Sequence, residues 1–496
     1  MMRRIFQSTG SLLVSSILVS AACSGTQAIP DVTLDPTEAA ATIEADDFRL
    51  RIGVLAHDSM RGRDTPSPEL AKAAAHIAGE FESFGLAPGA EGGFLQMYPL
   101  TMLSPGAAES QSFVIQGPGG EFTLAAADFV ALTQSGVLEA AGSLQVVEPQ
   151  SDMSVARDGI ALIPIDRSAF GLAFGSGLAD AMRTNGVQGV VLAVDETESY
   201  QHLARFVGRS STVLGEPASG AGPILVVDQA ALPEELGSAL NAGSTAGWSA
   251  TLRSQAEATV DQAMNTIGVL EGSDPLLKDE YVVFSAHMDH VGVGRAVDGD
   301  SIYNGADDDA SGTSAIMELA QAYASLGERP RRSLVFLTVS GEEKGLFGSE
   351  WYSEHPTLPL ESTVANLNID MIGRNWQDTI VAIGKSESSL GPLVEQVSAS
   401  HPDLNMSVID DRWPEENFYF RSDHYNFARK GVPILFFFNG VHDDYHRPSD
   451  EPEKIGYDKI SRITRLIFFL GLEVANADER PVWDPDAYER VVEGGQ

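Results

Sequence analysis

From residue 265 onward, near-continuous apolar runs alternate with helix-like segments, and this alternation restricts the fold more than any other feature of the chain. The expected strands cover residues 281–287, 333–340, 364–370, 379–383 and 433–438. The expected helices cover residues 314–326, 346–354, 389–400 and 458–475. Strands that are apolar along their whole length are typical of a parallel sheet covered by helices on both faces. We therefore predict a three-layer α/β/α sandwich on a mostly parallel mixed sheet.

A β-rich segment divides the chain into two parts. Residues 106–254 contain short apolar runs separated by Gly, Ser and Pro, with almost no clustered His, Asp or Glu. The helical stretch within residues 46–105 has too little apolar surface to fold alone, so we expect it to complete a domain formed by residues 255–478. The β-rich segment is then an insert between these two parts, and residues 479–496 are a C-terminal tail.

The N-terminus has the pattern of an export signal. Arg3 and Arg4 precede an apolar stretch, Leu12 to Ala22, that is too short to span a bilayer but has the length of a signal-peptide core. No other part of the sequence reaches about 18 consecutive apolar residues, so a second membrane segment is not expected. We interpret residues 1–23 as an export segment and residues 24–45 as a tether.

This export segment ends at Cys23, the only cysteine in the chain, so no internal disulfide can form. Small residues followed by cysteine resemble a bacterial lipobox, in which the cysteine is lipidated, although Ser20 stands where leucine is usual. Ordinary cleavage near Ala22 is the alternative. We expect an outer-membrane lipoprotein facing the periplasm or the cell exterior, in contact with the membrane only through Cys23. Without the lipid, the protein would be periplasmic or secreted.

The charge balance excludes one class of partner. The chain has 32 Lys and Arg against 70 Asp and Glu, a formal net charge of −38, and no clustered basic patch. Because nucleic-acid backbones are bound mainly through clustered Lys and Arg, we do not expect a nucleic-acid partner. The negative charge is better explained by solubility outside the cytoplasm.

Chemically reactive side chains gather at the ends of the expected strands, where open α/β sheets place their sites. Five segments carry them: Ser285–His290, Asn304–Gly312, Ser340–Gly345, Asn368–Met371 and Asp443–Asp450. Each alone has a structural explanation, since a carboxylate often caps a helix and a lone strand-end histidine is usually structural. Together, histidines and carboxylates from separate strand ends, in a chain without a usable thiolate, favour zinc or another borderline divalent ion.

The ordered set of five motifs resembles the co-catalytic di-zinc aminopeptidase family, which also contains glutamate carboxypeptidase-like and glutaminyl-cyclase-like members. The resemblance covers residues 265–475 and extends to residues 46–104, while the insert is similar to a protease-associated domain. It implies two zinc ions per chain that share one carboxylate. The implied ligands are His287, Asp308 and Asp370 for one ion, and Asp308, Glu343 and His446 for the other.

The resemblance implies roles for Glu342 and Asp289, and Tyr445 is a further candidate because it lies beside His446 in the sequence. Glu342 matches the general base, which takes a proton from the water shared by the two ions and passes it to the leaving amine. Asp289 matches the carboxylate that orients His287, and the two side chains point the same way on an extended chain. Tyr445 is a candidate donor to the oxyanion, with a packing role as the alternative.

The remaining polar groups near these motifs are expected to be structural. We assign Ser422, Asp423 and His424 to the support of the ligands, and we expect neither His290 nor His442 to bind metal.

The implied function is that of an extracytoplasmic zinc exopeptidase acting on peptides. An aminopeptidase is favoured because an acidic site suits a cationic N-terminus. A carboxypeptidase or dipeptidase would instead need a cation for the substrate carboxylate, for which Arg374, Arg412 and Arg421 are the candidates. Glutaminyl cyclase is disfavoured because that enzyme manages with one zinc. A non-catalytic peptide-binding protein would have lost its metals, whereas this chain retains all five ligands.

Overall fold

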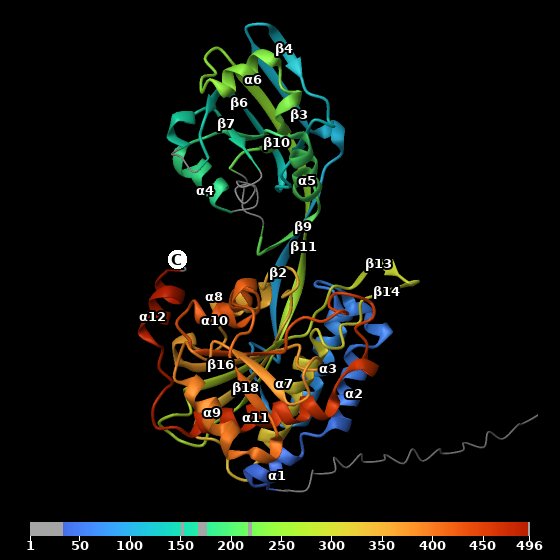
Figure 1. The fold of residues 1–496 in the computed structure, drawn as a ribbon, viewed down its shortest axis with the longest axis vertical. Coiled ribbons are helices and arrows are strands. Elements are labelled where there is room, and N and C mark those ends of the chain that lie inside the picture. Colours follow the sequence, from blue (N-terminus) through green and yellow to red (C-terminus); the bar gives the residue numbers. More distant parts are fainter. Residues whose placement is uncertain (1–32, 150–152, 167–175, 217–220, 495–496) are drawn as a thin grey trace, which may run out of the picture.

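The computed structural model describes residues 33–149, 153–166, 176–216 and 221–494, which form two lobes joined by long strands (Figure 1). The expected export segment and Cys23 lie outside these residues. In the part of the chain that is described, no helix combines the length and the apolar character that crossing a membrane requires.

A mixed sheet forms the centre of the larger lobe. Its strand order is β2, β11, β15, β12, β16, β19, β17, β18, and the short β1 (Ala87–Pro88) also pairs with β11. The four central strands, β15, β12, β16 and β19, run parallel to one another. The bounds are β2 Leu95–Pro105, β11 Ser249–Leu270, β12 Tyr281–His287, β15 Ser333–Val339, β16 Thr363–Asp370, β17 Thr379–Ile383, β18 Ser407–Ile409 and β19 Ile434–Phe438.

Helices cover both faces of this sheet. On one face lie α2 (Ala45–Leu55), α3 (Pro68–Ser83), α7 (Ala310–Ala324), α9 (Leu390–Ser400) and α11 (Tyr457–Asn476), which share one large apolar core with the sheet. On the other face, α8 (Phe347–Glu354) and α10 (His424–Ala428) enclose a second core. The predicted three-layer α/β/α sandwich on a mostly parallel sheet is thus confirmed. The early helices α2 and α3 share the apolar core of this lobe with helices from the C-terminal part of the chain.

The smaller lobe is built around a second sheet. Its strands lie in the order β6, β7, β8, β10, β5, with separate apolar cores on its two faces. The bounds are β3 Ser112–Gly117, β4 Gly120–Thr123, β5 Phe129–Ala131, β6 Gly136–Val146, β7 Ile160–Ile165, α4 Ser176–Asn185, β8 Gly189–Val194, α5 Thr197–Val207, β9 Ser211–Leu214, β10 Ile224–Asp228 and α6 Glu234–Asn241. That this lobe is a protease-associated domain stays a prediction.

Strand β11 belongs to both lobes. Its first half pairs with β3 and β6 of the smaller lobe, and its second half pairs with β2 and β15 of the larger one. The boundary expected between residues 254 and 255 therefore falls inside a continuous strand. In Figure 1 the smaller lobe stands above the larger one on β2 and β11.

Two segments near the ends of the described residues form helices that the sequence did not predict. Within the expected tether, α1 (Pro36–Ala41) begins after Asp35, whose side chain caps it, and it buries Ala39 and Ala40. The tether prediction is therefore wrong for this helix, whose short apolar face is covered by α11 and α7. Within the expected tail, α12 (Pro485–Tyr488) and a following π-helical turn, Glu489–Glu493, pack Val491 into the second core.

The loops that carry the five motifs leave the same edge of the sheet. His287 and Asp370 are the last residues of the parallel strands β12 and β16, and β15 ends just before the Ser340–Gly345 motif. A hairpin, β13 (Val293–Val297) and β14 (Asp300–Ile302), separates the first motif from the second. Because parallel strands place their carboxyl ends together, segments far apart in sequence meet at one place.

Candidate metal centre

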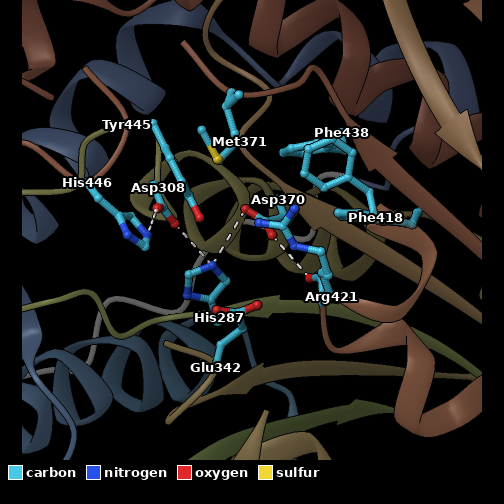
Figure 2. A pocket seen from close by; sticks show the side chains of 13 residues that line it. His287, Asp308, Glu342, Asp370, Met371, Phe418, Arg421, Phe438, Tyr445 and His446 are labelled. Atoms are coloured by element: carbon cyan, nitrogen blue, oxygen red, sulfur yellow. Dashed lines mark hydrogen bonds and ion pairs between the residues drawn. The ribbon is translucent and has the colours of Figure 1, made fainter. Parts of the chain in front are cut away.

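Five side chains from five loops converge at this edge. The ring Nε2 of His287 lies 3.3 Å from Oδ1 of Asp308 and 3.5 Å from Oδ1 of Asp370. On the opposite side, Nε2 of His446 lies 3.2 Å from Oδ2 of Asp308 and 3.0 Å from Oε2 of Glu343. Figure 2 shows Asp308 between the two histidines. One carboxylate therefore faces two separate groups of donors.

The three adjacent aspartates play different parts, which explains why only the middle one faces both groups. Asp309 accepts hydrogen bonds from the backbone of Gly312 (2.8 Å), Met371 (3.1 Å) and His287 (3.3 Å), so it caps α7 and ties two strand ends together. Asp307 accepts from the Gly373 N–H at 2.6 Å. The peptide bond between Asp308 and Asp309 is cis.

The buried carboxylates of this centre have shifted pKa values when no cation is bound. Burial raises the pKa of Glu342 well above its usual range, with His287 opposing this shift and Asp423 adding to it. Burial also raises the pKa of Asp370, again against the effect of His287. Burial lowers the pKa of His287, but Asp370 and Glu342 outweigh it, and the net pKa lies well above 6.5. Clustered carboxylates in this state are stabilised by a bound dication.

Unpaired donor atoms test whether a metal ion fits. Oδ2 of Asp308, Oε1 of Glu343 and Oδ1 of Asp370 are buried and make no hydrogen bond to any described residue. Two groups of donors emerge from the described residues, each within 4.8 Å: His287, Glu342 and Asp370; and His290, Asp308, Glu343 and His446. Nitrogen and oxygen donors in such groups suit Zn²⁺. The residues therefore fit metal ions on both sides of Asp308.

Asp289 is placed differently from the prediction. The ring Nδ1 of His287 lies 3.1 Å from the backbone carbonyl of Asp289 and 3.7 Å from its carboxylate. The carboxylate instead accepts hydrogen bonds from Thr65 Oγ1 at 2.9 Å and from the Gly341 N–H at 2.8 Å. It also accepts one from the Glu342 N–H at 3.4 Å. The main effect of this side chain is thus to fix the loop that carries the expected general base.

Arg63 is a supporting residue that no motif revealed. Its fully buried guanidinium donates to the carbonyls of Met288 and Asn304 at 2.8 Å and to that of Gly305 at 3.1 Å. These carbonyls belong to the loops of His287 and Asp308. No local sequence pattern indicates this role, because the contacts join residues far apart in the chain, 225 positions to Met288 and 241 to Asn304.

His290 lies within one of the two groups of donors, although we expect from the sequence that it does not bind metal. Its ring is fully buried, and Nδ1 lies 2.8 Å from Oε1 of Glu343 and 3.6 Å from Oδ2 of Asp308. His442 instead faces Asp307, with Nε2 3.2 Å from Oδ2. Of the two histidines, only His290 joins a donor group.

The other expected supporting residues lie beside Asp370. Ser422 Oγ donates to Oδ2 of Asp370 at 3.1 Å and accepts from the Asn368 side chain at 3.1 Å. His424 contacts the carbonyl of Tyr419 at 2.8 Å and stacks on Phe436. These contacts agree with a structural role for the Ser422–His424 segment.

A small cavity opens over the candidate centre. It is lined by His287, Asp308, Glu342, Asp370, Met371, Phe418, Arg421, Ser422, Phe436, Phe438, Val441, Tyr445 and His446. Figure 2 shows apolar side chains on one side of it and the Tyr445 ring, stacked on His446, on the other. The acidic centre thus lies beside a partly apolar wall.

The three arginines named for a substrate carboxylate have different surroundings. Arg374 is paired with Asp444 at 2.8 Å, and Arg412 lies over the Trp376 ring at 5.3 Å. Arg421 lines the cavity, with its guanidinium 4.7 Å from the Phe418 ring centre and 3.8 Å from the carboxylate of Glu416. Its side chain is 47% exposed, and Arg421 is the one of these three arginines that lines the cavity.

Comparisons with known proteins agree with this geometry. Residues 265–470 match Peptidase family M28. A probable glutamate carboxypeptidase of Arabidopsis thaliana is 35% identical over 238 residues, which are 44% of this chain and 32% of the relative. Aminopeptidase YwaD of Bacillus subtilis is 26% identical over 239 residues, 45% of this chain and 47% of the relative. The chain thus spans less than half the length of these two relatives.

A solved structure shares the fold over nearly the whole chain. The aminopeptidase from Aneurinibacillus sp. strain AM-1 superposes with a TM-score of 0.54 at 20% identity, covering 91% of this chain and 98% of that one. At this identity the likeness concerns the fold alone. The resemblance to the co-catalytic metallopeptidases that the five motifs indicate is confirmed, and residues 265–470 are the part of this chain that matches peptidase family M28.

Proposed function

We propose that this protein is an extracytoplasmic zinc-dependent exopeptidase, and that it is an aminopeptidase removing N-terminal residues from peptides. One observation carries the proposal: the two oxygens of Asp308 face separate donor groups, 3.3 Å from His287 and 3.2 Å from His446. The match to Peptidase family M28 supports hydrolysis of peptide bonds, and the relatives named aminopeptidase and glutamate carboxypeptidase support an exopeptidase.

Two zinc ions per chain complete the proposed centre. His287, Asp308 and Asp370 would hold one, and Asp308, Glu343 and His446 the other. Zinc held by these residues would supply Lewis-acid chemistry to a scissile carbonyl and a bound water. Glu342, beside such a cation, would stay in the charged form that a base requires.

Glu342 takes the proton of the attacking water and transfers it to the departing amine. It lines the cavity, in the donor group that also holds His287 and Asp370, and its side chain is partly exposed. The Asp289 carboxylate accepts hydrogen bonds from the backbone N–H groups of Gly341 and Glu342. These bonds fix the backbone that carries the proposed base. A general base held in place in this way needs no rearrangement during the reaction.

Tyr445 is proposed as the donor to the developing oxyanion. Burial, together with the charges of Asp308 and Glu343, raises the pKa of its hydroxyl well above the usual range, so the hydroxyl keeps its proton. The Tyr445→Phe variant should lower kcat about 100-fold or more with little change in KM, as loss of an oxyanion donor does. A packing role would leave kcat unchanged.

The preference for the N-terminal end of a peptide is proposed from the charge of the site. The acidic centre attracts the protonated amine of a peptide N-terminus and repels a C-terminal carboxylate. Hydrolysis of leucine anilide, compared with that of its N-acetylated form, tests this. We expect activity on the free amine alone. Equal rates on both compounds would contradict the aminopeptidase assignment.

A carboxypeptidase or dipeptidase is the second candidate, favoured by Arg421 in the cavity wall. If Arg421 binds the substrate's C-terminal carboxylate, Arg421→Met should lower kcat/KM about 10- to 100-fold on dipeptides and leave dipeptide amides unchanged. The Arg412→Met variant is the control, since Arg412 lies over Trp376 and is outside the cavity lining. The aminopeptidase assignment instead predicts equal effects of Arg421→Met on dipeptides and their amides.

The cellular location and the role of the smaller lobe rest on sequence. The export segment supports an extracytoplasmic protein anchored at Cys23, and incorporation of labelled palmitate that is abolished in Cys23→Ala would establish the anchor. The smaller lobe, which we interpret as a protease-associated domain, is proposed to restrict the site to short or flexible peptides. Its clean removal should widen the range of accepted peptide lengths; unchanged selectivity would refute this role.

A further inference from the structure

The buried ring of His290 is the feature that neither the family pattern nor the proposed ligand set uses. His290 follows His287 by three residues in the loop after β12, and its ring is fully buried. Neither ring nitrogen makes a hydrogen bond with any residue in the described ranges. Because the neighbours of Nδ1 are the carboxylates of Glu343 and Asp308, a cation bound between these groups would satisfy the ring and both carboxylates.

The surroundings of the ring are those of a metal donor. Nδ1 lies 2.8 Å from Oε1 of Glu343 and 3.6 Å from Oδ2 of Asp308, two oxygens that also lack hydrogen bonds. The ring meets that of His446 edge to face, with centroids 5.6 Å apart. Donor atoms of Asp308, Glu343, His446 and His290 all lie within 4.8 Å of one another.

The spacing of these donors agrees with a zinc ion. Around a tetrahedral ion with bonds of about 2.0 Å, neighbouring ligand atoms are about 3.3 Å apart. The contacts in this group are 2.8 Å and 3.6 Å for His290, and 3.0 Å and 3.2 Å for His446. His290 therefore satisfies the same spacing as an implied ligand.

The backbone leaves room for the ring at one glycine. A Cβ atom on Gly305 would lie 2.5 Å from Cγ and 2.6 Å from Cδ2 of His290. Gly305 also has φ +59°, a conformation that side-chain-bearing residues rarely adopt. The Asp308 loop is thus shaped around His290.

We propose that His290 donates its Nδ1 to the metal ion held by Asp308, Glu343 and His446. This site then has four protein ligands, while the site of His287, Asp308 and Asp370 has three. The inference rests on the proposed metal centre. It predicts that the two ions are bound unequally, with the four-ligand site the tighter one.

A hydrogen bond from His290 to Glu343 is the alternative. It would position Glu343 without touching the ion. The zinc-loaded full-length chain distinguishes the two through a crystal structure with anomalous scattering at the zinc edge. We expect Nδ1 of His290 within about 2.0–2.3 Å of the ion beside His446. A distance above about 3 Å, with both ions present, would overturn the inference and leave the proposed function intact.

Zinc affinity supplies an independent measurement. His290→Gln should weaken one of two zinc ions at least about tenfold in competition with a chelator, and leave the other unchanged. The matched control is His442→Gln, because His442 is nearly as buried but faces Asp307. We expect the control to keep both affinities. Equal loss of zinc affinity in both variants would show that His290 does not act by donating its ring nitrogen to the ion. Failure of the unaltered chain to bind zinc would refute the proposed function itself.

Discussion

Oδ1 of Asp308 lies 3.3 Å from Nε2 of His287, and this leaves its second oxygen facing His446 at 3.2 Å. Asp308→Asn replaces the shared carboxylate by a neutral amide that has only one oxygen. We expect both metal ions to be lost, because each site loses an anionic ligand. Elemental analysis of the dialysed variant measures this directly.

The control for that experiment is a ligand of one site only. Asp370→Asn should release one ion and keep the other, since Asp370 faces only His287 among the donor histidines. If Asp308→Asn retained two ions per chain, Asp308 would not be the shared ligand.

The part of the site contained in the motifs could be predicted from the sequence. The expected strand at residues 281–287 and the structure's β12 coincide, so the edge at which His287 lies followed from the pattern of apolar residues. Asp308 could be selected among three aspartates only by comparison with a family. The hydrogen bonds of Asp307 and Asp309 now explain why those two carboxylates face elsewhere.

The supporting contacts could not be predicted, because they join distant parts of the chain. Thr65 reaches Asp289 across 224 residues, and no local pattern encodes such a contact. The spacing of His287 and Asp289 correctly suggested proximity, yet the backbone carbonyl came closer than the carboxylate. Helix α1 was missed because its six residues bury little apolar surface and its stability comes from packing on α11 and α7.

Arg63 should stabilise the fold and the metal loops together. Arg63→Met leaves the carbonyls of Met288, Asn304 and Gly305 without their donor. A buried carbonyl left without a donor costs about 1–3 kcal/mol, and Arg63→Met leaves several in this state. Urea denaturation of the zinc-free chain measures the cost.

Arg61→Met provides the comparison for Arg63. Its side chain is 57% exposed and reaches Glu69 only at 3.9 Å. We expect its free energy of unfolding to stay within about 0.5 kcal/mol of that of the unaltered chain. A similarly small effect of Arg63→Met would contradict the supporting role.

Lys459 should make the free energy of unfolding depend on pH in the alkaline range. Burial lowers the pKa of this lysine to about 8, although the charge of Asp307 opposes the shift. Because the unfolded chain then binds more protons between pH 8 and about 10.4, the contribution of Lys459 is unfavourable below pH 8 and is relieved as pH rises.

The Lys459→Met variant isolates this contribution. Its free energy of unfolding relative to that of the unaltered chain should fall by about 1–3 kcal/mol between pH 7 and pH 10.5, because the loss of the hydrogen bond from Lys459 to the carbonyl of Arg374 adds only a term that does not vary with pH. Urea denaturation of both chains across this range measures the difference. A difference independent of pH would show that Lys459 is not the titrating group.

The most direct test of the account is the metal content and peptidase activity of Glu342→Gln, measured together. Glu342 is proposed to move protons, while Asp308, Glu343, Asp370 and the histidines hold the metal. We therefore expect about two zinc ions per chain in the variant and in the unaltered protein. Hydrolysis of leucine anilide by the variant should fall by at least about 100-fold. Full activity of Glu342→Gln with two zinc ions bound would contradict the assignment of the base, and absence of zinc from the unaltered protein would contradict the metal centre.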